Sequence, residues 1–197
     1  MLAPSVSWGV DHVQYELFSG PIKGYGWLIE AGTELFPSMG IATERLRFDA
    51  SYYLKLWGRS LLATHVMGAH SFTLSAGGPA SPDLHNPFYV SSDDIFRAYS
   101  FDDDRLRGDS LLGAKSELRF PLGEAIGLLA ADIGSIWSSD RTLGTGVTSS
   151  WSSGFCFNIP PLGFSFLFSR PLRVAPDPTG RPMDSSVFHF TLRYLYL

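Results

Sequence analysis

The stretch Glu44–Trp57, ERLRFDASYYLKLW, alternates apolar and polar side chains with a period of two residues. Successive side chains of a β-strand point to opposite faces, so this stretch predicts a strand with one apolar face and one strongly polar face. The apolar face carries Leu46, Phe48, Ala50, Tyr52, Leu54 and Leu56, and the polar face carries Arg45, Arg47, Asp49, Ser51, Tyr53 and Lys55.

The same alternation recurs along most of the chain and predicts about nine strands. Most of them have ten or more residues, whereas strands of soluble proteins usually have about five or six. A tilted membrane strand needs about 9–11 residues, so strand length favours a membrane β-sheet. In the first strand the apolar phase slips between Val10 and Val13, which predicts a β-bulge. The expected strands are 5–17, 22–36, 44–57, 59–72, 111–122, 125–137, 147–159, 162–172 and 186–197.

Composition agrees with a surface that faces lipid. Only 17% of the 197 residues are charged, against about 25% in a typical soluble domain, and 14% are aromatic. The longest uncharged stretch, Thr142–Ser169, is broken by glycines and prolines and cannot form an apolar membrane helix. The net charge of −4 gives no overall basic field for nucleic acid. A single cysteine, Cys156, excludes an internal disulfide.

Three motifs follow one another after this alternating first half of the chain. The long polar segment 72–110, expected to be a functional loop, contains Phe96-Arg97-Ala98-Tyr99. The next expected strand contains Glu117 in the run Ser116–Leu122, and the strand after it contains Asp132-Ile133-Gly134. The chain then closes with Ser169-Arg170-Pro171-Leu172, a polar linker and a last strand with His189, Thr191, Tyr194 and Tyr196.

In these motifs, taken in order, the chain resembles the outer-membrane β-barrel assembly superfamily. That group includes the bacterial barrel-assembly protein, the mitochondrial sorting and assembly barrel, plastid homologues and two-partner secretion transporters. The resemblance covers approximately residues 20–197 and is densest in 88–172. It implies that Phe96–Tyr99 is a lumenal loop motif, that Glu117, Asp132 and Gly134 are its partners, and that the last strand carries a closing signal.

Several positions depart from the family pattern. Ala98 stands where the family has a glycine at the loop tip, and Ala130 stands where it usually has phenylalanine. Thr191 replaces the glycine of the closing strand, and the chain ends in Leu197 where bacterial barrels usually end in an aromatic residue. Met1 leads directly into strand-like sequence without the basic and apolar regions of a secretory signal. We therefore expect an outer membrane of a mitochondrion or plastid in preference to a bacterial one.

The sequence allows two interpretations of Arg97. Taken alone, an arginine between acidic neighbours is most simply a solvated loop charge. On a loop that folds back into a barrel lumen, its guanidinium would need a carboxylate, and a bidentate pair is the strong form of that contact. Glu117 and Asp132 are the candidates, because each lies on the polar face of its expected strand. The resemblance favours this lumenal pair.

No residue pattern indicates catalysis, a cofactor or a metal. The run Asp102–Asp104 lacks the glycine and distal glutamate of a calcium loop. Ser152-Ser153-Gly154 lacks the glycine before the serine that a nucleophile elbow requires. Tryptophans on greasy faces or near strand ends are typical of an aromatic girdle. The histidines, which show no ligand spacing, are His12, His65, His70, His85 and His189.

The chain is thus expected to be all-β, a single membrane domain over 1–197 without a POTRA domain, and not an enzyme. The resemblance implies that it inserts and assembles β-barrel proteins, with lipid, unfolded β-barrel clients and accessory assembly subunits as partners. A passive pore or protein-secretion conduit on the same fold is the alternative. A soluble lipocalin-like barrel is a third reading, disfavoured because such a barrel is apolar inside and polar outside.

Nine strands is an odd number, whereas bacterial single-chain barrels have even numbers. A barrel of about eight strands is filled by its own side chains and has no room for the long loop. The matched motifs belong to the C-terminal half of the family's barrel. We therefore expect an antiparallel transmembrane β-barrel or its C-terminal part, seen as an open curved antiparallel sheet or as one whose first and last strands pair poorly. A closed small barrel with the loop outside is the alternative.

Overall fold

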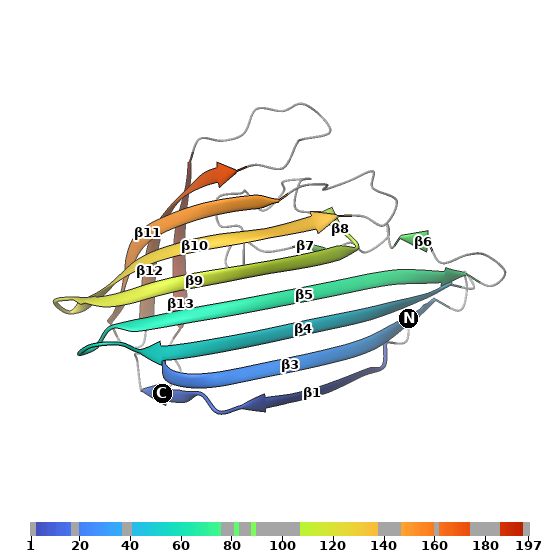
Figure 1. The fold of residues 1–197 in the computed structure, drawn as a ribbon, viewed down its shortest axis with the longest axis horizontal. Coiled ribbons are helices and arrows are strands. Elements are labelled where there is room, and N and C mark those ends of the chain that lie inside the picture. The colour runs from blue at the N-terminus through green and yellow to red at the C-terminus, as the bar shows by residue number, and fades with distance from the viewer. Residues whose placement is uncertain are drawn as a thin grey trace.

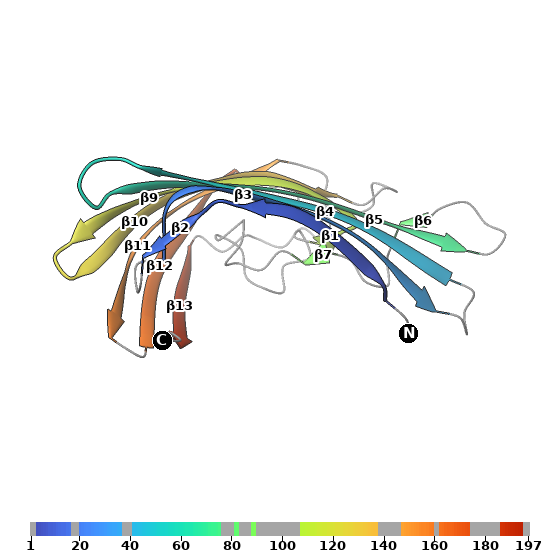
Figure 2. The same ribbon diagram turned by 90° about the horizontal axis from the view of Figure 1, so that it is seen from below.

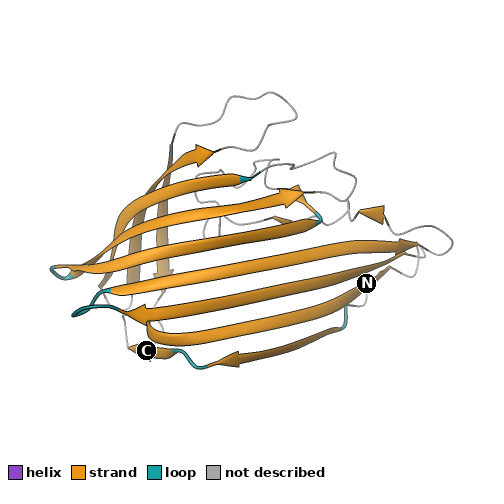
Figure 3. Ribbon diagram, in the orientation of Figure 1, coloured by secondary structure: helices purple, strands orange, loops and turns teal. Residues whose placement is uncertain are grey.

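A computed structural model describes residues 3–16, 20–36, 41–75, 81–82, 88–89, 107–137, 147–159, 162–173 and 186–194. The protein is all-β, and every ladder between its strands is antiparallel (Figure 3). The strands are β1 (Ser5–Asp11), β2 (Gln14–Glu16), β3 (Gly20–Phe36), β4 (Ile41–Lys55), β5 (Leu61–Ser75), β6 (Ser81–Pro82), β7 (Phe88–Tyr89), β8 (Arg107–Gly108), β9 (Ser110–Leu122), β10 (Ala125–Trp137), β11 (Thr148–Ile159), β12 (Leu162–Arg173) and β13 (Val187–Tyr194).

Among the described residues the main sheet has eleven strands, and nine of them follow one another in the order of the chain, β1-β3-β4-β5-β9-β10-β11-β12-β13 (Figure 1). The short strands β2 and β6 pair with β3 and β5. The expected set of nine strands is therefore confirmed, with ends that differ by a few residues. The segment 72–110 is only partly a loop, because β5 extends to Ser75 and β9 begins at Ser110. That segment also contributes β6, which pairs with β5, and the ribbon formed by β7 and β8.

The main sheet is curved and open. Figure 2 shows it bent into an arch, with β7 lying under the arch. Among the described residues no ladder joins β1 to β13, so these two strands are the edges of the sheet. The expectation of an open sheet with unpaired first and last strands is confirmed.

The apolar face of the sheet is exposed. Side chains expected on the apolar faces retain large exposed fractions, for example 39% for Phe48, 51% for Tyr52 and 65% for Phe188. A soluble barrel would bury these side chains inside, so the exposures contradict the lipocalin-like reading. Rings from the last three strands of the sheet stack on this face, with Phe157 and Phe164 centroids 5.0 Å apart.

The polar face is the concave one. A Cβ added to Gly108, in the ribbon on the concave side, would lie 2.7 Å from Cγ2 of Ile136. Ile136 therefore points under the arch, and side-chain alternation gives Asp132 the same direction. A small apolar strip is buried on this face and consists of Leu61, Ala63, Met67, Ala69, Leu111, Ala130 and Ile136.

The first strand is interrupted close to the predicted bulge, but the extra residue lies on the partner strand. β1 ends at Asp11, whose carboxylate accepts a hydrogen bond from the backbone N–H of Val13 at 2.8 Å, and pairing with β3 resumes at Gln14 in the same register. The register shifts between Gln14 and Tyr15, where Ile22 of β3 is the additional residue. Gly24 faces this break with φ of +117°, and a Cβ there would lie 2.2 Å from the carbonyl oxygen of His12. Only glycine fits so close a backbone approach in this conformation.

The described part of the chain contains no helix that could span a membrane.

Candidate functional site

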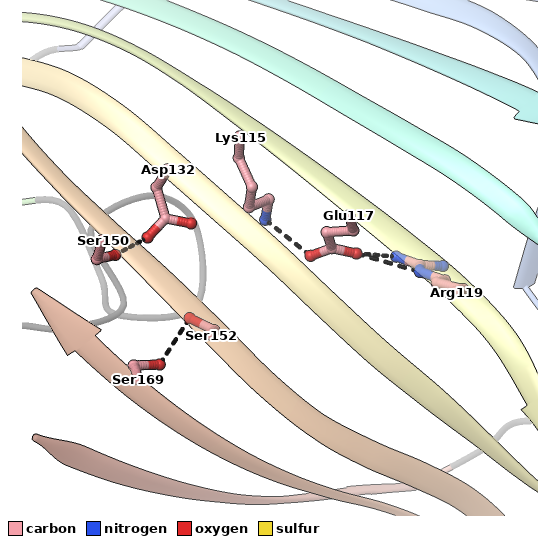
Figure 4. Close-up of polar contacts among 7 residues, drawn as sticks. All are labelled: Lys115, Glu117, Arg119, Asp132, Ser150, Ser152 and Ser169. Atoms are coloured by element: carbon pink, nitrogen blue, oxygen red, sulfur yellow. Dashed lines mark hydrogen bonds and ion pairs between the residues drawn. The ribbon is translucent and has the colours of Figure 1, made fainter. Parts of the chain in front are cut away.

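The concave face of β9 carries a carboxylate held by two cations. Glu117 is 3% exposed, and its Oε2 accepts hydrogen bonds from Nη2 of Arg119 at 2.6 Å and from Nε at 3.1 Å. Nζ of Lys115 lies 3.7 Å from the other carboxylate oxygen. The three side chains are two residues apart on one strand, so the β-period places them on the same face (Figure 4). These contacts compensate the burial of the carboxylate inside the arch.

A second buried carboxylate lies on the neighbouring strand. Asp132 of β10 is 2% exposed and is the direct cross-strand partner of Lys115 on β9 and of Ser150 on β11. The Ser150 hydroxyl donates a hydrogen bond to Asp132 Oδ2 (Figure 4). Ser152 and Ser169 continue this polar row on β11 and β12, with hydroxyl oxygens 2.8 Å apart. The row is almost completely buried.

A third charged group lies on β4 and β5. Asp49 Oδ1 is 2.9 Å from Nε2 of His65, and Asp49 Oδ2 accepts a hydrogen bond from Nε of Arg47 at 2.5 Å. His65 and Lys115 are direct partners in the β5–β9 ladder, so this group adjoins the β9 cluster. Ionisable side chains therefore cross four neighbouring strands of the concave face without a break.

The end of the long segment is fixed to the sheet beside this row. The backbone N–H of Ser71 donates to the carbonyl of Asp109 at 2.7 Å. The Ser110 hydroxyl donates to Asp109 Oδ1 at 2.7 Å, and Nδ1 of His70 is 2.8 Å from the same hydroxyl. A Cβ on Gly108 would lie 2.4 Å from the carbonyl oxygen of Trp137. These contacts hold β8, and with it β7, against the ends of β5 and β10.

A hollow of about 580 Å³ opens on the concave face over β1, β3, β4, β5 and β9. Small residues such as Gly26, Ser51 and Ala63 leave this space, and Tyr53 and the charged groups of β4, β5 and β9 surround it. The hollow is open, and side chains of both charges line it. Such a lining suits a polar chain or water and not an apolar ligand.

The structure brings together some of the residues that the sequence singled out. Glu117 and Asp132 lie on adjacent strands of the concave face, and Gly134 follows two residues after Asp132 on β10. On the last strand His189 and Thr191 share the concave face, opposite Leu167 and Ser165 of β12, and Tyr194 ends the strand. The loop motif Phe96, Arg97, Ala98 and Tyr99, as well as Tyr196, lies outside the described residues.

Some members of the network were not expected from the sequence. The ion pairs of Arg119 and Lys115 with Glu117 were not anticipated. The signal for them is that opposite charges two residues apart lie on the same face of a strand. Ser150, Ser169 and His65 could not be found without the strand register. Among the described residues no group of three or more histidine, cysteine, aspartate or glutamate side chains could hold a metal ion.

No protein-family model and no curated protein sequence matches the chain.

Proposed function

We propose that this chain is part of the wall of a transmembrane β-barrel that inserts and assembles other β-barrel proteins in an outer membrane. The observation that carries the proposal is the separation of the two faces. The seven longest strands have 12 to 17 residues, with an apolar face that is exposed and a polar face that is concave and largely buried. A closed barrel with lipid outside and water inside requires this pattern.

The open edges support the assembly role. Hydrocarbon offers no hydrogen-bond partners, so an unpaired edge strand in a membrane costs several kcal/mol for each unsatisfied backbone group. An unfolded client strand has the same need. β1 and β13 do not pair with each other among the described residues, so each edge is suited to act as a template for such a strand. The order of the Phe96, Glu117 and Asp132 motifs resembles a superfamily that includes barrel-assembly proteins, which supports assembly as the first candidate.

The proposal is tested by client folding. The purified chain is reconstituted into phospholipid vesicles, a urea-unfolded outer-membrane β-barrel is added, and the rate at which the client becomes protease-protected is measured. We expect a rate well above that of empty vesicles. A rate equal to that of empty vesicles, from vesicles shown to hold the folded chain, would contradict the proposal.

A pore or secretion conduit is the second candidate, and the hollow of about 580 Å³ on the concave face is the observation that favours it. Conductance across a planar bilayer separates the two functions. A steady open conductance without client acceleration would favour the conduit, and client acceleration with a closed baseline would favour assembly.

A further inference from the structure

We propose that the concave face carries a binding site for a phosphate-bearing group at the end where the β4–β5 and β9–β10 turns lie. The site is formed by Lys55, Arg59 and Arg119. A second hollow, of about 340 Å³, lies between the β4–β5 turn (56–60) and the β9–β10 turn (123–124). Its volume is at the low end of the range of small-molecule sites, about 300–1,000 Å³. This site is independent of the proposed assembly function.

Three cations from separate places in the chain line this hollow. Lys55 ends β4, Arg59 belongs to the β4–β5 turn, and Arg119 lies on β9. Positive charges that line one hollow repel one another, and an anion held between them would relieve that repulsion. The sequence does not show this convergence, because residues 55 and 119 come together only through the β4–β5 and β5–β9 ladders.

Two of these cations have spare binding capacity. Arg119 is engaged by Glu117, at 2.6 Å. Lys55 and Arg59, in contrast, form no ion pair with any residue in the described part of the chain. Glu124 is the anionic side chain that lines the hollow. The excess of guanidinium and ammonium donors over carboxylate matches a phosphate oxyanion.

Apolar side chains also line the hollow, among them Leu61, Pro121 and Ile126, and Ser60 adds a hydroxyl. Basic side chains beside apolar ones fit the headgroup region of an anionic phospholipid as well as a free phosphate ester, and both present the same phosphate chemistry. The two sources are distinguished by measurement.

The experiment uses the 197-residue chain in a non-ionic detergent and a phosphate-free buffer. Affinity for inorganic phosphate and for glycerol 1-phosphate is measured by calorimetry for the parent chain, Lys55→Gln, Arg59→Gln and Glu124→Gln. We expect each lost cation to weaken binding about fivefold and Glu124→Gln to tighten it. Arg173→Gln, which removes an exposed cation from the far end of β12, is the matched control and should leave the affinity unchanged.

A second arm measures co-sedimentation of the same variants with vesicles of phosphatidylcholine alone or with phosphatidylglycerol. Loss of the phosphatidylglycerol preference in Lys55→Gln and Arg59→Gln, but not in Arg173→Gln, would identify the lipid headgroup as the ligand. Loss of soluble phosphate binding alone would identify a free phosphate ester. No effect in either arm, or an equal effect of Arg173→Gln, would overturn the proposal. Retained strand content in circular dichroism verifies that each variant is folded.

Discussion

Nη2 of Arg119 lies 2.6 Å from Oε2 of Glu117, and the two side chains leave the same face of β9 two residues apart. Glu117 is almost fully buried while Arg119 retains some exposure, so the carboxylate depends on its cations more than the guanidinium depends on it. Replacing a charged partner on the concave face should therefore have unequal effects at the two positions.

For this pair, we expect Arg119→Gln to destabilise the fold by about 2 kcal/mol, because it removes the closest counter-charge of a buried carboxylate. Glu117→Gln should cost less, since Arg119 can turn toward solvent. The double variant should cost clearly less than the sum of the singles, with a coupling of about 1 kcal/mol. Urea unfolding in lipid vesicles measures all three. Additive single effects would show that the pair does not interact.

Adjacent residues of β4 test which face meets lipid. Ala50 lies on the apolar face and Ser51 on the concave face beside the hollow. An arginine on a lipid-facing position near the membrane centre costs about 2–4 kcal/mol. Ala50→Arg should lose this much stability in vesicles, whereas Ser51→Arg should lose less than about 1 kcal/mol because its charge stays in water. Equal losses would contradict the membrane assignment of the faces.

The hydroxyl pair Ser152–Ser169 offers a test of buried polar contacts. Both residues are at most 1% exposed. Ser152→Ala should cost about 1–3 kcal/mol, because it leaves the Ser169 hydroxyl buried without its partner. Ser152→Ala combined with Ser169→Ala should recover part of that loss, since neither hydroxyl then remains. A double variant less stable than either single variant would refute this account.

Two glycines with positive φ separate steric fit from backbone conformation. Gly24 has φ of +117° and no room for a Cβ beside His12, whereas Gly58 has φ of +57° and no heavy atom within 4 Å of a Cβ. Gly58→Ala should cost about 1 kcal/mol, the conformational penalty alone. Gly24→Ala should cost at least twice as much, because the strands must also separate at the interruption of the first strand. Thermal unfolding of the two variants compares them directly.

The lumenal pairing of Arg97 with Glu117 or Asp132 is a prediction of the sequence alone. If it is right, Arg97→Ala should reduce client assembly more than it reduces the amount of folded barrel, because it deprives a buried carboxylate of a counter-charge. Arg105→Ala, in the same segment, is the control and should leave assembly unchanged. A cross-link between cysteines placed at 97 and 132 checks the proximity itself. Equal loss of assembly from both alanine variants would leave no specific role for Arg97.

Period-two alternation was enough to predict the strands and the exposed face, because a β-strand assigns each side chain to a face without reference to its neighbours. The phase slip near Val13 predicted an interruption of the first strand, but not that the extra residue would lie on β3. Contacts between strands were less accessible, since pairing Asp132 with Ser150 requires the register between β10 and β11, which alternation along each strand does not give. The small strands of the segment 72–110 were missed because two-residue ribbons leave no periodic signal.

The parity of the sheet limits how its edges can be joined. Nine strands in the path make eight antiparallel steps, so β1 and β13 run in the same direction. A ladder formed directly between them would have to be parallel. Two copies of the sheet with the same orientation in a membrane would likewise meet in parallel ladders, β13 of one copy against β1 of the other. A ring with only antiparallel ladders requires an odd number of additional strands between the two edges. Any strand that bridges both edges by itself must run opposite to each, which fixes the polarity of a one-strand insert before its sequence is considered.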